Sequence, residues 1–284
     1  MTYPLRITPI FSIDKIVKDA GYGGSCPIIV QADGVEYILR TKEDGMQPKS
    51  LGILNEMLAY QLLSVLGYTI APQEVVYLWI DDDFIEAAEI ACREGVIKAE
   101  SLDYIRESKG VNIGIEYLHY AMDPLSSINN QKFIRDIVHI DNYIMNCDRT
   151  TNNPNILQDK KDKRKFYAID FGNALADGKA YSKIVDGELE DTLQLGKVVN
   201  CNATLSGRYL FRNPMKPIVK RGRNIKDDSV KIRKIIDTIF DTFPPETEWE
   251  PIQYRDRIAD VVAQRIKSKV IFETDAHAKC DCLY

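Results

Sequence analysis

The chain has 284 residues, of which 45% are hydrophobic and 28% are charged. This length suits one large domain or two closely packed lobes, and the composition excludes collagen-like, low-complexity and disordered chains. The 37 basic and 42 acidic residues leave a net charge of −5, so the chain lacks the basic excess of a general nucleic-acid-binding protein.

The start of the chain and its apolar runs argue against export and against a membrane span. Asp14 interrupts the apolar character of the first residues, so they do not form a signal peptide. The longest apolar runs resemble the segment VVYLWI at 75–80, well short of the roughly 20 residues that cross a bilayer. We therefore expect a soluble protein.

The six cysteines are spread along the whole chain, at 26, 92, 147, 201, 280 and 282. This density is too low for a small disulfide framework, so we expect reduced thiols and a cytoplasmic protein. His277, Cys280 and Cys282 are three potential metal ligands, but no fourth ligand lies nearby. A frayed C-terminal tail is the better interpretation of this segment.

The first half of the chain predicts strands around one helix. Asp33-Gly34 separates two β-branched runs and is a strong hairpin signal. Gly67 follows an apolar helical pattern as its C-terminal cap. In chain order we expect strands near 26–32 and 35–42, a helix over 52–66, a strand over 74–80, an inserted helical pair, and a strand over 111–118.

The second half is predicted to be mostly helical. Apolar residues recur at helical spacing within 128–146, and Pro124, Ser126 and Ser127 are expected to start that core helix. Two short strands, 155–158 and 165–169, then form a hairpin with a charged turn. Two more amphipathic helices are expected near 229–241 and 252–271.

Two acidic residues stand where phosphoryl transfer requires them. Asp148 follows the core helix and precedes the hairpin, and Asp170 opens the tripeptide Asp170-Phe171-Gly172 directly after it. In kinases one carboxylate orients the attacking hydroxyl, while a second carboxylate and an amide oxygen hold Mg²⁺. The kinase signature of Asp, four residues, Asn, hairpin and Asp-Phe-Gly is met by Asp148, Asn153 and Asp170. Each residue alone is common in turns, but their joint order and spacing favour a site.

A glycine cluster precedes the first predicted hairpin. Gly21, Gly23, Gly24 and Ser25 offer backbone N–H groups that could lie over nucleotide phosphates. The signal is weak, because Cys26 stands where the full glycine pattern requires its last glycine, and glycine clusters are more often plain turns.

Glu56 lies inside the predicted 52–66 helix, whose helical wheel is apolar almost all round. A buried carboxylate needs a cation. Arg40 and Lys42 project from one face of the preceding strand, and we expect one of them to pair with Glu56 and contact the nucleotide phosphates. The alternative is a partly exposed Glu56 at the helix start, favoured by the helix dipole.

Four segments, 21–45, 54–72, 146–157 and 168–175, together resemble the HipA-like kinases of bacteria. The resemblance is to the short stand-alone branch with a D-R-T-x-x-N-P-N loop, and it covers roughly 21–177. It implies an α+β, two-lobed protein-kinase-like fold with a β-rich N-lobe (1–118) and a helical C-lobe (119–284). It also implies ATP and Mg²⁺ as cofactors and serine or threonine hydroxyls as acceptors.

The resemblance assigns roles to single residues. Asp148 takes the catalytic-base position, while Asn153 and Asp170 take the metal positions. Residues at the end of the last N-lobe strand are expected to form the hinge that contacts adenine: Glu116, Tyr117 and Leu118.

Three features complicate the match to the kinase pattern. Arg40 replaces the usual lysine, and its planar guanidinium is not interchangeable with an ammonium, so either Lys42 takes over or activity is reduced. Asn155 competes with Asn153 as metal ligand, because it directly precedes Ile-Leu as the metal-binding Asn of ordinary kinases does. No A-P-E sequence follows at a usable distance, which argues against an ordinary activation segment.

An ATP-dependent kinase acting on a protein is the leading interpretation. A small-molecule or lipid kinase on the same scaffold is the first alternative, since a fold does not fix its substrate. A nucleotide-binding pseudokinase that binds a partner or DNA is the second, supported by Arg40 and by the basic stretch 216–234. The sequence leaves the acceptor, the partner and the oligomeric state open.

Overall fold

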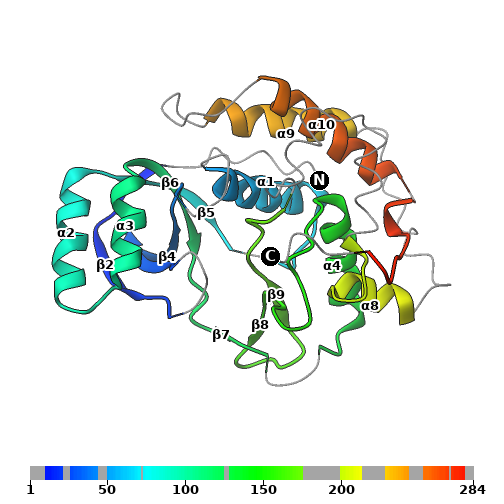
Figure 1. Cartoon of the computed structure of the whole chain (residues 1–284), viewed down its shortest axis with the longest axis horizontal. Helices are drawn as coiled ribbons and strands as arrows, with labels where there is room; N and C mark the ends of the chain where they lie inside the picture. The colour runs from blue at the N-terminus through cyan, green and yellow to red at the C-terminus, as the bar shows by residue number, and fades with distance from the viewer. Residues whose placement is uncertain are drawn as a thin grey trace.

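The computed structural model describes residues 10–21, 26–43, 50–71, 73–124, 128–174, 199–212, 228–242, 252–268 and 270–278. A β-rich lobe built from the first part of the chain stands beside a larger, mainly helical body (Figure 1). The architecture is therefore α+β, as the sequence predicts.

A six-stranded sheet forms the β-rich lobe, in the order β1-β5-β6-β4-β3-β2. All neighbouring strands are antiparallel except β1 and β5, which are parallel. The strands are β1 (Ile10–Ser12), β2 (Lys15–Asp19), β3 (Ile28–Ala32), β4 (Val35–Arg40), β5 (Val75–Ile80) and β6 (Gly110–Glu116). Neither β1 nor β2 was predicted from the sequence.

The Asp33-Gly34 hairpin is confirmed. Both residues have positive φ, 48° and 77°, as the favoured two-residue hairpin turns require. The second strand ends at Arg40 rather than at the predicted residue 42, because the Asn112 side chain takes the Lys42 N–H at 2.8 Å in place of a strand partner.

Helices cover both faces of this sheet. On one face α1 (Leu51–Leu66) packs against side chains such as Tyr77 and Ile113, and on the other α2 (Asp82–Arg93) and α3 (Ala99–Glu107) pack against their neighbours on β5, such as Leu78. This alternation follows from the two-residue period of a strand. The inserted helical pair is therefore confirmed.

Gly67 ends α1 as predicted. It has a φ of 71°, its N–H bonds Ser64 O at 3.1 Å, and the next N–H, of Tyr68, bonds Leu63 O at 2.9 Å. These bonds satisfy carbonyl groups at the helix end that would otherwise lack partners.

The second lobe contains a small sheet and several helices. The sheet has the order β7-β8-β9. The elements are β7 (Ala121–Met122), α4 (Gln131–Tyr143), β8 (Ile156–Asp159), β9 (Phe166–Ala168), α8 (Leu205–Arg212), α9 (Asp228–Thr242), α10 (Ile252–Lys267) and a 3-10 turn, η2 (Val270–Phe272).

The core helix α4 begins later than predicted. Its N-cap is Asn130, whose side chain accepts the Phe133 N–H at 3.0 Å. Pro124, expected to start the helix, lies before this cap, and Ser126 and Ser127 lie outside the described residues. Asn is among the best N-cap residues, because its short side chain reaches the N–H groups of the first turn.

One hydrophobic core joins the two lobes. It runs from the α1 face of the sheet through Phe171 to buried residues of α4, α9 and α10, including Ile137, Ile235 and Ile258. Figure 1 shows α1 lying between the sheet and these helices. The position of α1 therefore links the geometry of the β-rich lobe to that of the helical body.

The cysteines differ from the expectation of reduced thiols throughout. Cys26 and Cys92 are free, but Cys147 and Cys201 are both buried and disulfide-bonded. Sparse spacing in a sequence does not reveal which thiols the fold brings close together. Among the described helices, none is both long and apolar enough to cross a membrane.

Candidate active site

Asp148 lies in the loop between α4 and β8, in direct contact with Asn155. The Asn155 side-chain amide donates to Asp148 Oδ2 at 3.1 Å, and the Asn155 carbonyl accepts the Ile169 N–H at 3.0 Å. Asn155 has a φ of 47°, a left-handed conformation that Asn adopts more readily than most residues. Asn155 thus connects Asp148 to the strand end that carries Asp170.

Asn153 plays a different part in the same loop. Its N–H bonds Thr150 Oγ1 at 2.9 Å and its carbonyl accepts the Thr150 N–H at 2.9 Å, which closes a tight turn. The residue is exposed. Of the two candidate amides, the structure places that of Asn155 against Asp148.

Arg149 anchors this loop and was not singled out from the sequence. Its buried guanidinium bonds the Asp141 carboxylate at 3.2 Å and the carbonyls of Pro154, Asn155 and Ile169. A planar group with several N–H donors suits this convergence of acceptors. The only sequence signal is its place beside Asp148, because the backbone carbonyls that it binds carry no side-chain signature.

Burial raises the pKa of Asp141 to about 6, against the opposing effect of Arg149 and of hydrogen bonds from Arg149, Ser206 and Asn146. The carboxyl is almost fully buried, with 1% of the residue exposed. Such a pair is costly to break, since removal of one partner leaves the other unsatisfied in the interior.

Helix α1 holds the Asp170-Phe171-Gly172 segment. Glu56 Oε2 accepts the Phe171 N–H at 2.7 Å, and the Asn55 side chain donates to the Gly172 carbonyl at 2.9 Å. The Phe171 ring is fully buried and packs edge-on against Tyr60, with the ring centroids 5.4 Å apart. Asp170 itself has a φ of 57°, which is uncommon for a non-glycine residue and typical of functional sites.

Of the two cations considered from the sequence, Arg40 and Lys42, Arg40 reaches this segment. Its Nη2 lies 2.9 Å from Asp170 Oδ1 and 4.0 Å from Glu56 Oε2. The expected pairing with Glu56 is therefore present, although the shorter contact is with Asp170.

Lys42 lies elsewhere. Its ammonium donates to the Lys109 carbonyl, and it does not line the cleft that contains Arg40. Strand alternation places the two residues on one face, but β4 ends at Arg40, so the alternation no longer holds at Lys42.

Glu56 is a buried carboxyl with an altered acidity. Burial raises its pKa to about 8, while Arg40 and the Phe171 N–H act in the opposite direction. The side chain is 0% exposed, so the charged form loses nearly all its hydration. Burial therefore favours the neutral form of Glu56, and the shorter of the two Arg40 contacts is with Asp170.

A cleft of about 330 Å³ opens beside these residues. Apolar side chains from both lobes line it, among them Ile38, Ile115, Leu157 and Ile169. Its wall also includes residues singled out from the sequence, which are Arg40, Glu56, Glu116, Tyr117, Leu118 and Asp170. Asp148 and Asn155 lie outside this wall, in the loop that is hydrogen-bonded to Ile169.

The predicted hinge joins β6 to β7 along this cleft. The N–H groups of Glu116 and Tyr117 bond the Glu74 and Glu36 carbonyls, at 2.9 and 2.8 Å. Among the described residues, the Leu118 N–H has no hydrogen-bond partner. It is therefore available to a ligand acceptor.

Three buried polar atoms in the cleft wall lack a hydrogen-bond partner within the described part of the chain: Glu56 Oε1, the Tyr60 hydroxyl and Gln73 Oε1. Buried polar groups in proteins are nearly always paired. Tyr60 and Gln73 are residues of the cleft wall that sequence reasoning missed.

In the sequence, the glycine cluster stands between β2 and β3, which pair in antiparallel orientation. Gly21 has a φ of 81° and donates its N–H to Asp19 Oδ1 at 2.6 Å. Gly23, Gly24 and Ser25 lie outside the described residues. The far end of the loop reaches Pro27, which lines the cleft.

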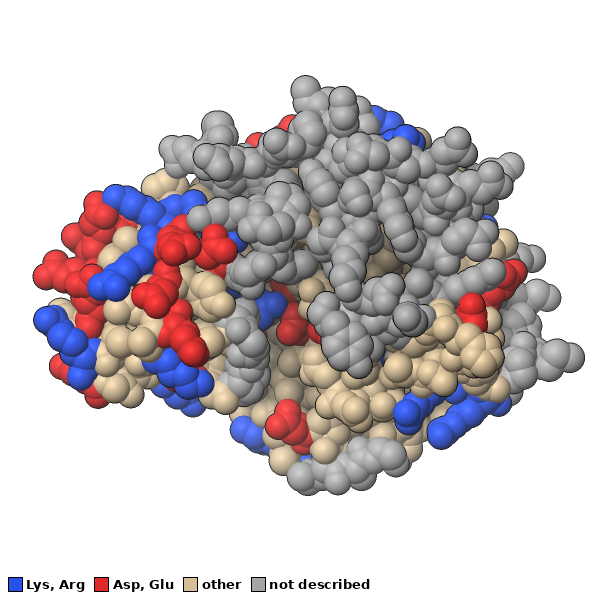
Figure 2. Space-filling view, viewed as in Figure 1, with Lys and Arg blue, Asp and Glu red and all other residues tan. Residues whose placement is uncertain are grey.

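The inserted helices are attached to both ends of this loop. The Asp19 N–H bonds the Val96 carbonyl at 3.1 Å, and Ser101 Oγ donates to the Cys26 carbonyl at 3.0 Å. Figure 2 shows acidic and basic side chains gathered over the lobe that carries α2 and α3, on the left of the view. This helical pair therefore combines a charged outer surface with an inner contact to the loop.

No protein-family model matches the sequence, and no curated protein sequence matches it. Among solved structures, the chain is similar to a proinflammatory kinase, CtkA, of Helicobacter pylori. The TM-score is 0.51 at 16% sequence identity, over 93% of this chain and 95% of that chain. At this identity the likeness shows a shared fold, and the kinase-like fold expected from the sequence is confirmed.

Proposed function

We propose that this protein is an ATP- and Mg²⁺-dependent phosphotransferase, a HipA-like kinase that acts on serine or threonine hydroxyls of a protein. One observation carries the proposal. Asn155 bonds Asp148 through its side chain and Ile169, next to Asp170, through its backbone. This links the loop that carries Asp148 to the segment that carries Asp170, and Asp170 lines a cleft between the lobes.

The residues present fit a nucleotide. The apolar walls around Ile38 and Leu157 suit a purine ring, and the unpartnered Leu118 N–H suits a ring nitrogen. Arg40 suits phosphate oxygens, because its N–H groups match them in pairs.

The residues present also fit Mg²⁺. Asp170 and Asn155 offer the carboxylate and amide oxygens that this ion prefers, and Asn153, in its exposed turn, is the less suitable amide. When bound with the nucleotide, the ion neutralises negative charge on the phosphate oxygens.

Within this site Asp148 acts on the acceptor hydroxyl. Its carboxylate accepts a hydrogen bond from the hydroxyl and takes the proton as the oxygen bonds to the γ-phosphorus. The bond from that phosphorus to the bridging oxygen breaks, and ADP leaves with its electron pair. Asn155 holds the Asp148 carboxylate in position, and Arg40 stabilises charge on the phosphates.

We propose that the acceptor is a protein. We also propose that the protein acts in the cytoplasm, because phosphoryl transfer requires a supply of ATP. A small-molecule or lipid acceptor would use the same site. A pseudokinase remains the contrasting alternative, since the Arg40–Asp170 contact occupies an oxygen that a metal would bind.

The test is intact-protein mass spectrometry and phosphosite mapping after incubation with ATP and Mg²⁺, alone and with cell extract. Asp148→Asn is the matched control, because it keeps the shape of the side chain and removes its charge. We expect transfer by the parent, none by the variant, and equal nucleotide binding by calorimetry. Nucleotide binding without transfer to any protein, lipid or small molecule would establish a pseudokinase, and absence of nucleotide binding would refute the proposal.

A further inference from the structure

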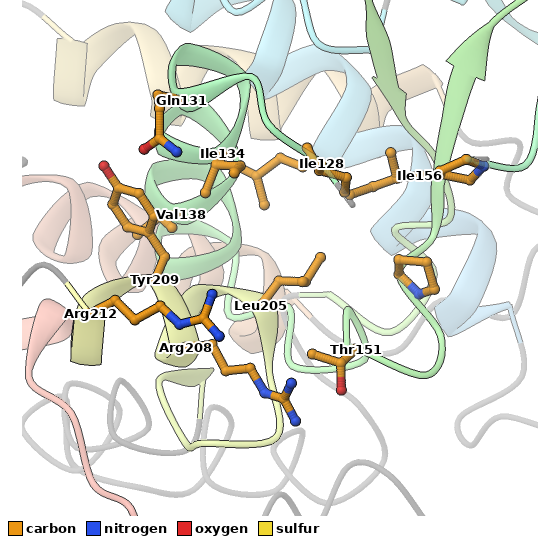
Figure 3. A pocket seen from close by; sticks show the side chains of 13 residues that line it. Ile128, Gln131, Ile134, Val138, Thr151, Ile156, Leu205, Arg208, Tyr209 and Arg212 are labelled. Atoms are coloured by element: carbon orange, nitrogen blue, oxygen red, sulfur yellow. The ribbon is translucent and has the colours of Figure 1, made fainter. Parts of the chain in front are cut away.

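A second cavity, of about 450 Å³, lies on the helical body between α4, α8 and the loop that carries Asp148. Figure 3 shows aliphatic side chains of Ile128 and Ile134 on one side of the opening and the side chains of Arg208 and Arg212 on the other. The proposed phosphoryl transfer does not use this cavity, and none of its lining residues lines the nucleotide cleft.

The floor of the cavity is aliphatic. Ile137, Val138 and Ile156 are buried there, and Leu205 is half-buried beside them. Its volume exceeds that of one aliphatic side chain and lies within the usual range of ligand pockets, roughly 300–1,000 Å³. Burial of a partner's apolar side chain in this cavity would be favourable, because it removes apolar surface from water.

The rim is positively charged. Arg208 and Arg212 are exposed on α8, and among the described residues no aspartate or glutamate lines the cavity. Arg208 Nε bonds the Asn202 carbonyl at 3.0 Å, which fixes its direction. Arg212 has no ionic partner among the described residues. A ligand with an aliphatic group and an adjacent negative charge complements this surface.

The cavity is tied to the catalytic loop. The Leu205 N–H at the start of α8 bonds the Arg149 carbonyl at 3.1 Å, and Thr150 and Thr204 form a β-bridge. Thr151, three residues after Asp148, is part of the cavity wall. Three extended residues span at most about 10 Å, so a segment held in the cavity lies within a few residues of a hydroxyl at Asp148.

We infer that this cavity docks the protein substrate, by a segment that carries an aliphatic side chain next to aspartate or glutamate, within about three residues of the accepted serine or threonine. The aliphatic side chain enters between α4 and α8, and the acidic group meets Arg208 and Arg212. The inference rests on the proposed function, and it names the substrate class of that site.

The test uses fluorescein-labelled peptides with one central serine, measured by fluorescence anisotropy without nucleotide. A Leu-Asp-Asp block is placed at each of several spacings before or after the serine. Matched peptides carry Leu-Lys-Lys or Ala-Asp-Asp, and a labelled single-stranded oligonucleotide forms a further arm. We expect at least one Leu-Asp-Asp peptide to bind about tenfold more tightly than both matched peptides.

Charge reversal provides the protein-side test. Arg212→Glu replaces attraction by repulsion and is expected to weaken the best peptide about tenfold or more. Arg135→Glu, also exposed but on α4 outside the cavity, is the matched control and should leave binding unchanged. Both positions are exposed, so neither substitution disturbs the core.

Three outcomes would overturn the inference: no peptide binds, acidic and basic peptides bind equally, or the two variants behave alike. Tighter, Arg212-dependent binding of the oligonucleotide would assign the cavity to nucleic acid instead. Because nucleotide is absent, failure of phosphoryl transfer leaves a positive peptide result standing. Phosphoryl transfer without peptide preference would keep the proposed function and reject the docking site.

Discussion

Arg40 Nη2 lies 2.9 Å from Asp170 Oδ1, so the strand cation binds the carboxylate proposed to hold the metal. Burial raises the pKa of Glu56 to about 8, and Arg40 lies farther from this carboxyl, at 4.0 Å, than from Asp170. If Asp170 holds Mg²⁺, either this contact shifts or the ion uses the other carboxylate oxygen, Oδ2. The incoming phosphates would provide Arg40 with replacement acceptors.

The position of Arg40 predicts a marked contrast with Lys42. Arg40→Met should lower the rate of phosphoryl transfer about 100-fold, a loss typical of a missing electrostatic donor at a transition state. Lys42→Met should change it little, because Lys42 donates to the Lys109 carbonyl away from the cleft. The measurement is the initial rate of phosphoryl transfer at saturating ATP and Mg²⁺. A larger loss of rate in Lys42→Met than in Arg40→Met would show that Lys42, not Arg40, contacts the phosphates.

The Asp148–Asn155 contact predicts which amide serves the metal. Asn155→Ala should raise the Mg²⁺ concentration needed for half-maximal activity roughly 10–100-fold, as loss of a ligand or its support usually does. Asn153→Ala is the control, because that residue is exposed in a turn with Thr150. Titration of the transfer rate with Mg²⁺ distinguishes the two variants. A larger increase in the required Mg²⁺ concentration for Asn153→Ala than for Asn155→Ala would indicate that Asn153 is the metal ligand.

Local signals made much of the fold predictable. Asp33-Gly34 and Gly67 encode their turns through positive φ, which few other residues adopt easily. β1 and β2 were missed for physical reasons. The three residues of β1 pair with β5, far away in sequence, and β2 is a partly exposed edge strand without a regular apolar alternation. Such strands form because a neighbouring strand is present to pair with, so their own sequence carries little signal for a strand.

At the site, the order of Asp148 and Asp170 around a hairpin was readable because their chemistry requires those residue types. The choice between Asn153 and Asn155 was not, since it depends on the backbone turn that Thr150 closes. Arg149 escaped notice because its partners are mostly backbone carbonyls. Sequence patterns therefore identify reactive groups better than the contacts that position them.

The buried Glu56 predicts a pH-dependent stability. Its pKa is about 8 in the folded protein against 4.5 as the ordinary value, so between these values the folded state keeps a proton that the unfolded chain releases. The stability that Glu56 contributes, measured as free energy of unfolding, is fully present below pH 4.5, where the carboxyl is protonated in both the folded and the unfolded chain. It falls by up to about 1.4 kcal/mol per pH unit as pH rises towards 8.

Glu56→Gln isolates this effect, because an amide keeps the acceptor for the Phe171 N–H but does not ionise. The variant should gain stability relative to the parent as pH rises from 5 to 8, measured by urea unfolding. Asp141, with a pKa raised to about 6, adds the same trend to both proteins and cancels in the difference. A pH-independent difference between the two proteins would show that Glu56 is ionised throughout.

Ser101 is predicted to position the glycine-containing loop. Its Oγ donates to the Cys26 carbonyl at 3.0 Å, and a hydrogen bond of this kind contributes about 1 kcal/mol. Ser101→Ala should therefore raise the KM for ATP up to about fivefold with little change in kcat. Asp103→Ala, on the same helix with a side chain 73% exposed, is the control. An equal KM in parent and Ser101→Ala would show that the α3 contact has no effect on nucleotide binding.

Gly207 is predicted to be irreplaceable in α8. A Cβ at this position would lie 1.8 Å from the Cys201 carbonyl oxygen, so the helix would have to move away from that backbone. Alanine gains about 1 kcal/mol of helix propensity over glycine, but overpacking of this kind costs roughly 1–3 kcal/mol or more. We therefore expect Gly207→Ala to lower the free energy of unfolding and to weaken the Leu205–Arg149 bond that joins α8 to the catalytic loop.

Gly95→Ala is the control, because its φ of 73° is unfavourable for alanine but its surroundings are open. This substitution should lower the free energy of unfolding by only about 1 kcal/mol. Urea unfolding of both variants tests the prediction, and a Gly207→Ala protein as stable as the parent would show that α8 can shift without cost.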